Sequence, residues 1–468
     1  MILKNIKITN FHCFRNDIFC FSKKTTVLIG KNGRGKSSLV KAIKNALSVF
    51  FSNNTRWGYP SLAGTVPDLG VANMNIREVW HDDKMKYADF VDLKVCAEYC
   101  GSNLPDWSFH KRAREKANSQ SSYYKEAYVE FYKRYQTYNI LPIFAYYSDS
   151  FPHIDTNLSS NIKAMIDNDD ILDRSWGYYH WDYDTSCAII WQLRFMRIFR
   201  LYSSYIKILE DTEGTSNALK ESLSKKIDKY SAEINYIKNQ LKRFAANDNP
   251  NLSGKPEDLQ IADLFVDGIN TPYIVLLMSD GSCRRWDELP AGYARLFNIV
   301  LDLAYRSYVL NGPNAKVQGV VFIDELDLHL HPSMEQDVLY RFRNAFPDLQ
   351  FIVTTHSPLV IGNFQQDVDN TIIQMEYSNG KFDHHFVENI FGMDYDVTLS
   401  SIMATEPRNE RIQMLKDKYV RLMLRSKNDK ALEVLEQLRM MVSNDYYAQI
   451  VSELSKIISN NKHYEIHQ

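Results

Sequence analysis

The feature that most constrains this chain is the octapeptide GKNGRGKS at residues 30–37. It matches a phosphate-binding pattern of Gly, four residues, Gly-Lys and then Ser or Thr. The preceding residues, TVLI at 26–29, predict a short buried strand, and residues 38–50 predict a helix. A simple glycine-rich turn would require neither flanking element. The sequence therefore predicts a nucleotide site between a strand and a helix.

Each residue type in this octapeptide has a physical reason to be there. Glycines let the backbone N–H groups curl toward a polyphosphate, and the helix N-terminus adds a positive dipole. Lys36 is expected to neutralise the β and γ phosphates of ATP, and Ser37 to hold Mg²⁺. The candidate nucleotide-binding residues here are Asn32, Gly33, Gly35, Lys36, Ser37 and Ser38.

Two later strands supply candidate catalytic residues. VVFID at 320–324 reads as a buried strand that ends in Asp324, an expected Mg²⁺ ligand, and Glu325 follows as a candidate base for the attacking water. FIVT at 351–354 leads to His356, which could donate a hydrogen bond to the γ-phosphate. A strand-ending acid can be a turn residue, and a lone histidine is more often structural. Their positions directly after buried strands favour the catalytic interpretation.

Composition limits the class of protein. The chain has 468 residues, of which 45% are hydrophobic and 24% charged, so an ordinary globular protein of two or three domains is expected. A formal net charge of −2 argues against a uniformly basic nucleic-acid coat but leaves a local basic face possible. There is no apolar run of membrane-spanning length, and the six scattered cysteines suit a reducing compartment. We expect a cytoplasmic protein that makes no membrane contact.

Four motifs in a fixed order carry a family resemblance. The octapeptide at residues 30–37 is followed by LPAGYARLFNIVLDLAYRS at 289–307, by VVFIDELDLHLHP and by VTTHSPLV. They look like the Walker A, signature, Walker B with D-loop, and switch-histidine motifs of ABC-type ATPases. The closest likeness is to the RecF/SMC-like branch, whose members also begin with a strand resembling KNIKITNF.

This resemblance implies an α/β fold, an ABC-type P-loop ATPase head split in sequence, with a helical hairpin insertion and a helical C-terminal extension. In such heads the signature helix of one subunit covers the ATP held by another, so ATP closes a homodimer or a higher homo-oligomer. Leu289 and Gly292 of the signature segment accordingly join the expected nucleotide-binding set.

Two positions depart from the family pattern. The signature usually offers Ser where this chain has Pro290, which removes a hydroxyl contact to the γ-phosphate. Gly292 and the N–H groups that begin the following helix could substitute. The usual Arg after Asn-Phe is His12 here, which weakens a phosphate role at that position. Both departures concern the rate of hydrolysis more than ATP binding, and no Q-loop glutamine is identified.

The motif positions predict four domains or segments. Residues 1–150 form the N-terminal half of the ATPase domain, and 151–255 a helical insertion. Residues 256–390 form the C-terminal half, and 391–468 a helical extension. Within the insertion, residues 187–209 and 216–243 predict an antiparallel helical hairpin with its turn near Gly214.

Two helical surfaces, one in the insertion and one in the C-terminal extension, are candidates for binding a partner molecule. Residues 216–243 carry seven Lys or Arg and three Asp or Glu, which fits an arm that contacts DNA or a partner and fits equally a packed subdomain with a solvated face. In the extension, Leu432, Leu435 and Leu438 form a second apolar set, for which we expect an oligomer or partner interface.

A narrower resemblance covers most of the chain. ILPIFAYY at 140–147, the signature segment and FGMDYDVTLSSIMATEPRNERIQMLKDKYVRLM near the C-terminus are similar to the PtuA family, the ATPase subunit of Septu-type and retron-linked anti-phage systems. This implies an ATP-driven sensor or switch subunit that controls a separately encoded HNH-type nuclease. The alternatives are a DNA-repair ATPase of the RecF/SMC type and an ATP-binding scaffold with little turnover.

Overall fold

The chain forms two compact units, Met1–Met393 and Asp394–Gln468, which are described separately. A computed structural model describes residues 1–64, 66, 69–113, 119–148, 160–167, 172–183, 188–211, 217–246, 248–250, 260–268, 270–313, 316–378, 381–403 and 410–465.

The first unit is organised around a six-stranded sheet with the order β14-β13-β3-β12-β11-β7. Its parallel strands are β3 (Thr25–Ile29), β7 (Ile143–Tyr147), β11 (Gly319–Ile323), β12 (Leu349–Thr354) and β13 (Asn370–Ser378), and β14 (Lys381–Val387) is the antiparallel edge. Every residue of β3, β11 and β12 is buried, as expected for parallel strands covered on both faces. Because these strands are parallel, their carboxyl ends meet at one edge. The strands predicted at 26–29, 320–324 and 351–354 are confirmed.

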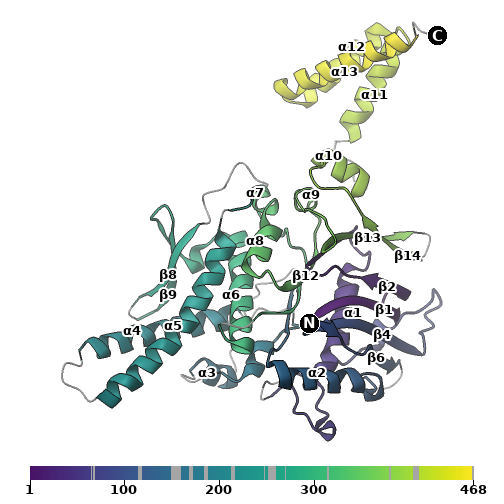
Figure 1. Ribbon diagram of the computed structural model, residues 1–468. Coiled ribbons are helices and arrows are strands. Elements are labelled where there is room, and N and C mark those ends of the chain that lie inside the picture. The colour runs from purple at the N-terminus through teal and green to yellow at the C-terminus, as the bar shows by residue number, and fades with distance from the viewer. Residues whose placement is uncertain are drawn as a thin grey trace. The chain divides into compact units, whose positions relative to one another are not determined.

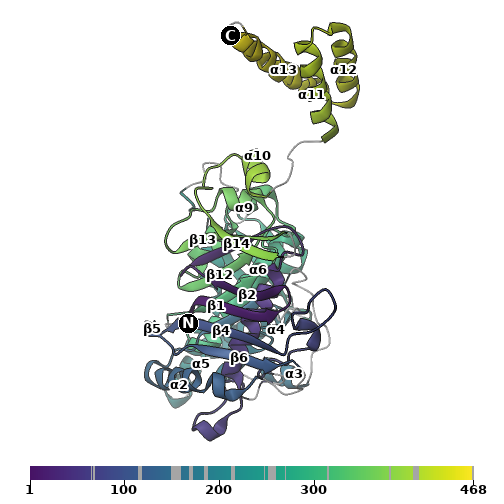
Figure 2. The same cartoon turned by 90° about the vertical axis from the view of Figure 1, so that its right-hand side faces the viewer.

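A second, antiparallel sheet lies beside it. It contains β1 (Ile2–Phe11), β2 (Phe14–Cys20), β4 (Phe90–Tyr99), β5 (Ser102–Asn103) and β6 (Trp107–Arg112). Figure 2 shows β2, β1, β4 and β6 side by side in that order. The buried amide of Gln350 on β12 joins the two sheets, because its Nε2 donates to the Leu3 carbonyl at 2.8 Å and its Oε1 accepts from the Leu3 N–H at 2.8 Å. Helix α1 (Lys36–Leu47) packs on this sheet.

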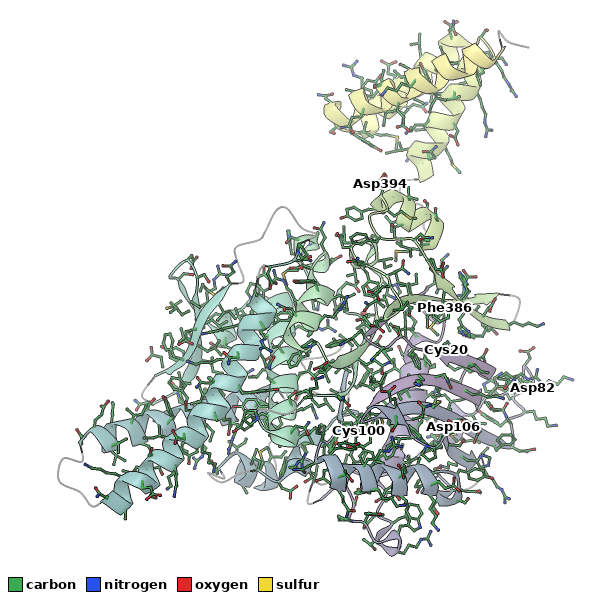
Figure 3. All side chains as sticks on the ribbon, viewed as in Figure 1. Cys20, Asp82, Cys100, Asp106, Phe386 and Asp394 are labelled. Carbon is green, nitrogen blue, oxygen red and sulfur yellow. The ribbon has the colours of Figure 1, made fainter. Side chains whose placement is uncertain are left out.

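The edge strand β14 connects the sheets at a second place. His384 of β14 is 2.8 Å from the carbonyl of Ile18 on β2, and the Phe382 ring meets the Phe14 ring edge-on at 4.8 Å. Phe386 of β14 and Cys20 of β2 mark this junction in Figure 3.

The predicted hairpin helices are present as α4 (Ala188–Glu210) and α5 (Asn217–Ala245), which run side by side (Figure 1). The predicted turn near Gly214 lies outside the described residues. A buried ion pair between Arg194 and Glu233, at 3.1 Å, joins the two helices. Both helices pack on α6 (Ala291–Asn311), which contains the signature segment. The C-terminal end of α5 also contacts α8 (Val338–Ala345), where Arg341 Nη1 donates to the Phe244 carbonyl at 3.2 Å.

Shorter elements complete the first unit. They are α2 (Lys125–Tyr138), α3 (Ser160–Ile166), α7 (Pro332–Glu335), α8 (Val338–Ala345), α9 (Pro358–Gly362) and the three-stranded sheet of β8 (Ile261–Asp267), β9 (Tyr273–Met278) and β10 (Cys283–Arg285). None of the described helices is long and apolar enough to span a bilayer.

The second unit contains α10 (Tyr395–Val397), α11 (Glu410–Leu424), α12 (Asn428–Met441) and α13 (Asn444–Glu465). Its core is built on Leu438, Ile450 and Leu454, and Leu435 packs against them. The expectation that Leu435 and Leu438 face outward is therefore wrong, because both stabilise this bundle itself. Leu432 does lie outside, with 63% of its surface exposed.

Candidate nucleotide-binding site

A cavity of about 450 Å³ lies at the carboxyl ends of β3, β11 and β12. Nine residues predicted from the sequence line it: Asn32, Gly33, Gly35, Lys36, Ser37, Ser38, Asp324, Glu325 and His356. The phosphate-loop segment after β3, the acidic pair after β11 and the histidine after β12 thus face one space. This is the edge at which parallel α/β sheets place ligands.

The loop before α1 depends on glycine at two positions. Gly35, the residue before α1, has φ of 86°, and a Cβ there would lie 2.8 Å from Cys13 Sγ. A Cβ on Gly30 would lie 2.4 Å from the Met375 carbonyl oxygen on β13. The curled backbone and its close approach to neighbouring elements therefore exclude larger residues.

Lys36 lies inside this loop. Its Nζ donates to the Gly30 carbonyl at 2.6 Å and to the Lys31 carbonyl at 3.4 Å. Burial lowers the pKa of Lys36, and the nearby carboxylates of Asp324 and Glu325 oppose that shift. A flexible ammonium held by two carbonyls can exchange them for phosphate oxygens, which would be stronger, charge-assisted partners.

Ser37 and Asp324 are brought together although they are 287 positions apart in the chain. Ser37 Oγ donates to Asp324 Oδ2 at 3.1 Å, and Thr354 Oγ1 donates to Asp324 Oδ1 at 2.5 Å. One hydroxyl and one carboxylate are the oxygen donors that Mg²⁺ takes when substrate phosphates and water complete its shell. Within the described residues no cluster of three His, Cys, Asp or Glu could hold a metal alone. The residues present fit Mg²⁺ bound together with a nucleotide.

Glu325 occupies a strained backbone position on the wall of this cavity. Its φ is 47°, a left-handed conformation that costs a non-glycine residue roughly 1–2 kcal/mol and is concentrated at functional sites. The Glu325 N–H donates to Thr354 Oγ1 at 2.8 Å, and the next N–H, of Leu326, donates to the Thr354 carbonyl at 2.9 Å. These bonds hold the backbone while the half-buried carboxylate faces the cavity.

His356 is fixed through its backbone. Its N–H donates to Asp327 Oδ1 at 3.2 Å, and Thr355 Oγ1 donates to the same oxygen at 2.6 Å. Burial is the main cause that lowers the pKa of the His356 imidazole, and the positive charge of Lys36 lowers it further. The ring is therefore neutral near pH 7 and retains one N–H donor.

Arg295 is a positioning residue that sequence reasoning missed. It lies on α6 with only 1% of its surface exposed. Its guanidinium donates to the carbonyls of Asp324 at 2.8 Å, Glu325 at 3.0 Å and Leu326 at 3.3 Å. Helix α6 thereby holds the backbone that carries both acids. The available signal was an arginine beside the apolar residues of a helical run.

Leu289 and Gly292 do not line the cavity of their own chain. Pro290 immediately precedes α6, and Pro290 and Ala291 are exposed. Gly292 is buried against the segment that follows Glu325, since a Cβ there would lie 2.3 Å from the His329 carbonyl oxygen. At the start of α6, Pro290 and Ala291 thus lie at the surface, whereas Gly292 packs against its own chain.

Further cavity residues come from the antiparallel sheet and its loops. They include His12, Cys13, Arg77 and His81. His12 Nε2 is buried and has no hydrogen-bond partner among the described residues, and burial lowers the pKa of this imidazole. The arginine that the family has at this position made a phosphate role for His12 less expected, yet His12 lies on the cavity wall.

The phosphate loop, the Ser37–Asp324 pair and the parallel sheet define an ABC-type P-loop ATPase. The family described as "AAA domain, putative AbiEii toxin, Type IV TA system" matches residues 100–362, more than half of the chain, and the family "AAA ATPase domain" matches residues 1–175. The chain belongs to the first of these ATPase families.

Individual proteins are also similar. The Retron Vc95 probable ATPase of Vibrio cholerae serotype O1 biovar El Tor is 24% identical over 91% of this chain and 84% of its own length. Septu protein PtuA of Bacillus mycoides (strain KBAB4) is 27% identical over 36% of this chain and 26% of its own. The SMC head domain from Thermotoga maritima covers 83% of this chain and 100% of that structure, at 11% identity and a TM-score of 0.39. The expected resemblance to retron-linked ATPases and PtuA is confirmed.

Proposed function

We propose that this chain is an ATP-hydrolysing switch subunit of an anti-phage defence complex, and that it controls a separately encoded nuclease. The observation that carries the ATPase part is the placement of Glu325 beside the Ser37–Asp324 pair in one cavity. The defence context is supported by the similarity to the retron ATPase and PtuA proteins.

The phosphate-loop residues provide binding. The backbone N–H groups from Asn32 to Ser38 and the Lys36 ammonium hold the ATP phosphates, while Ser37 and Asp324 hold Mg²⁺. When bound, Mg²⁺ supplies positive charge that offsets the charge of the β and γ phosphates.

Glu325 and His356 act on the reaction. The Glu325 carboxylate accepts a proton from the attacking water, which is the role of a general base. The neutral His356 ring donates a hydrogen bond to a γ-phosphate oxygen. Arg295 positions the Glu325 carboxylate by donating hydrogen bonds to the Asp324 and Glu325 carbonyls.

The site is completed by a second molecule. Leu289, Gly292 and the first N–H groups of α6 lie outside their own cavity and contact ATP held by another copy, so ATP closes a homodimer or a higher oligomer. This arrangement explains how ATP binding and hydrolysis could change the assembly that holds the nuclease.

A scaffold with little turnover is the second candidate. Pro290 favours it, because the residue before α6 lacks the hydroxyl that would reach the γ-phosphate.

The DNA-repair alternative has less support, since several basic residues of α5 have partners within the chain. Lys225 pairs with Glu221 at 2.7 Å, and Lys238 and Lys242 pair with Asp263 at 3.0 and 3.4 Å.

The control of a nuclease is tested by co-expressing the chain with the product of the adjacent gene. We expect a stable complex whose mass contains both proteins and whose nuclease activity differs between ATP and a non-hydrolysable analogue. A complex that fails to form, or nuclease activity that ignores the nucleotide, would contradict the switch role and leave the ATPase assignment intact.

A further inference from the structure

A second hollow, of about 550 Å³, lies between α3, α4 and the start of β9. Figure 1 shows α3 beside α4. None of the residues that line this hollow also lines the nucleotide cavity. We refer to it below as the α3–α4 groove.

The groove uses a face of α4 on which Arg200 and Ser204 are exposed and the other groove residues are half-buried. The groove residues of α4 are Leu193, Met196, Arg197, Arg200, Leu201 and Ser204, a helical spacing that places them on one side. Trp191, Arg194, Phe195 and Ile198 are buried on the opposite side. There the Trp191 ring stacks on the Tyr305 ring of α6 at 4.9 Å. Helix α4 therefore has one packed face and one open face.

The open face is positively charged. Among the residues that the structure describes, Lys163, Arg197 and Arg200 line the groove together with one acid, Asp167. Arg197 already binds Asp167, at 3.5 Å between the charged groups and 3.0 Å to the Asp167 carbonyl. Lys163 and Arg200 are exposed and make no side-chain ion pair or hydrogen bond with any residue that the structure describes. Two cations are thus available to an incoming anionic group.

The remaining lining distinguishes between two kinds of anionic partner. Apart from Ser204 it is apolar, with Ile166, Leu193, Met196, Leu201 and Pro272, and none of the described residues that line the groove carries an aromatic ring. Single-stranded nucleic acid is held by aromatic rings on which bases stack, and this groove offers none. A methionine-containing aliphatic floor instead accommodates apolar side chains of varied shape. Carboxylates beside such a side chain would match the Lys163 and Arg200 charges.

We infer that the α3–α4 groove docks an acidic segment of a partner protein, with one apolar side chain on the aliphatic floor and flanking carboxylates on Lys163 and Arg200. The inference does not rest on the proposed nuclease control. The charged contacts lie at the rim, so binding weakens as ionic strength rises, while the apolar anchor supplies the part that salt does not screen.

The test is fluorescence anisotropy with the full chain and a labelled acidic peptide that carries one central leucine. Lys163→Glu combined with Arg200→Glu should weaken binding by roughly tenfold or more, the effect of losing about 1.4 kcal/mol of binding free energy. Lys207→Glu reverses one charge on α4 outside the groove, half of the charge change in the groove variant, and should leave the affinity unchanged. Replacing the peptide leucine by serine should also weaken binding, and unchanged ATP turnover shows that the variants are folded.

Three results would overturn the inference. The acidic peptide could fail to bind the unmodified chain, or the Lys207→Glu control could lose as much affinity as the groove variant. In the third result, a labelled single-stranded oligonucleotide would bind the unmodified chain and bind the groove variant more weakly, while the peptide would bind both equally. That result would assign the groove to nucleic acid.

Discussion

At the residue scale, burial favours the neutral form of the His356 imidazole. Because the pKa of its imidazole is lowered from 6.5, the folded protein keeps this ring neutral at a pH where the unfolded chain begins to bind a proton. The stability contributed by this group is therefore present above pH 6.5 and is lost as pH falls from 6.5 through the lowered folded pKa.

The corresponding prediction concerns turnover. If neutral His356 donates to the γ-phosphate, then kcat/KM, which reports groups of the free enzyme, should show no transition of this ring at its ordinary pKa of 6.5, and His356→Gln, which keeps an N–H donor, should lose less activity than His356→Ala. The measurement is a pH profile of kcat/KM for the three proteins. A transition near pH 6.5 that disappears in His356→Gln would show that the charged ring is the functional form.

Arg295 gives the second prediction at this scale. Arg295→Met leaves the carbonyls of Asp324, Glu325 and Leu326 without their donor, so we expect the free energy of unfolding to fall by about 3 kcal/mol. Turnover should fall further than ATP affinity, because the Glu325 backbone loses its support. Denaturant unfolding measures the first effect and steady-state kinetics the second.

The control for Arg295 is Arg285→Met, which removes a partly exposed arginine paired with Asp287 and should change stability by less than about 1 kcal/mol. Equal losses of stability in the two variants would mean that the three carbonyl contacts contribute nothing specific.

At the scale of elements, helix α6 links the signature segment to the acids after β11. A methyl group on Gly292 would meet the His329 carbonyl oxygen, so Gly292→Ala must shift either the first turn of α6 or the segment after Glu325. We expect turnover to fall roughly tenfold to a hundredfold, as misplaced catalytic groups do, with ATP affinity unchanged at the Lys36 loop. Gly70→Ala is the matched control, since a methyl there meets nothing within 4 Å. Full activity in Gly292→Ala would show that this packing does not position the site.

Among the strands of the six-stranded sheet, those that the sequence could predict are buried on both faces. The strands β3, β11 and β12 are continuous apolar runs, so their positions and the residues that follow them were predictable. By contrast β14, KFDHHFV, has partly exposed residues throughout and lies at the sheet edge, where no apolar run or clean alternation identifies it. Likewise β8 has only two buried residues among seven.

Side-chain partners were harder to predict, because they depend on three-dimensional packing. An apolar stripe such as Leu435 and Leu438 indicates that a helix is covered, but it does not say by what, and here the bundle covers it itself. Arg295 resembles a surface charge in the sequence, and only the carbonyls converging on it explain its burial. His12 was discounted because it differs from the family pattern, although it occupies the cavity wall.

At the scale of the whole molecule, different residues serve ATP binding and ATP hydrolysis in the proposed function. In the proposed function, Lys36, Ser37 and Asp324 act on bound phosphates and metal, Glu325 acts on water, and Leu289 and Gly292 act from a second copy. A chain that binds ATP without hydrolysing it should therefore remain in the closed oligomer. This separation is what an ATP-driven switch requires.

The most direct test compares Glu325→Gln with Lys36→Ala for ATP affinity, turnover and mass in the presence of ATP. Glutamine keeps the shape of Glu325 but removes its basicity, so hydrolysis should fall roughly 10² to 10⁴-fold while ATP still binds and the oligomer persists. Lys36→Ala should lose ATP binding itself, because the main counter-charge to the phosphates is gone. Near-normal turnover in Glu325→Gln would contradict the role of Glu325 as the general base. If the unmodified chain hydrolysed ATP as slowly as Glu325→Gln, an ATP-binding scaffold with little turnover would be favoured.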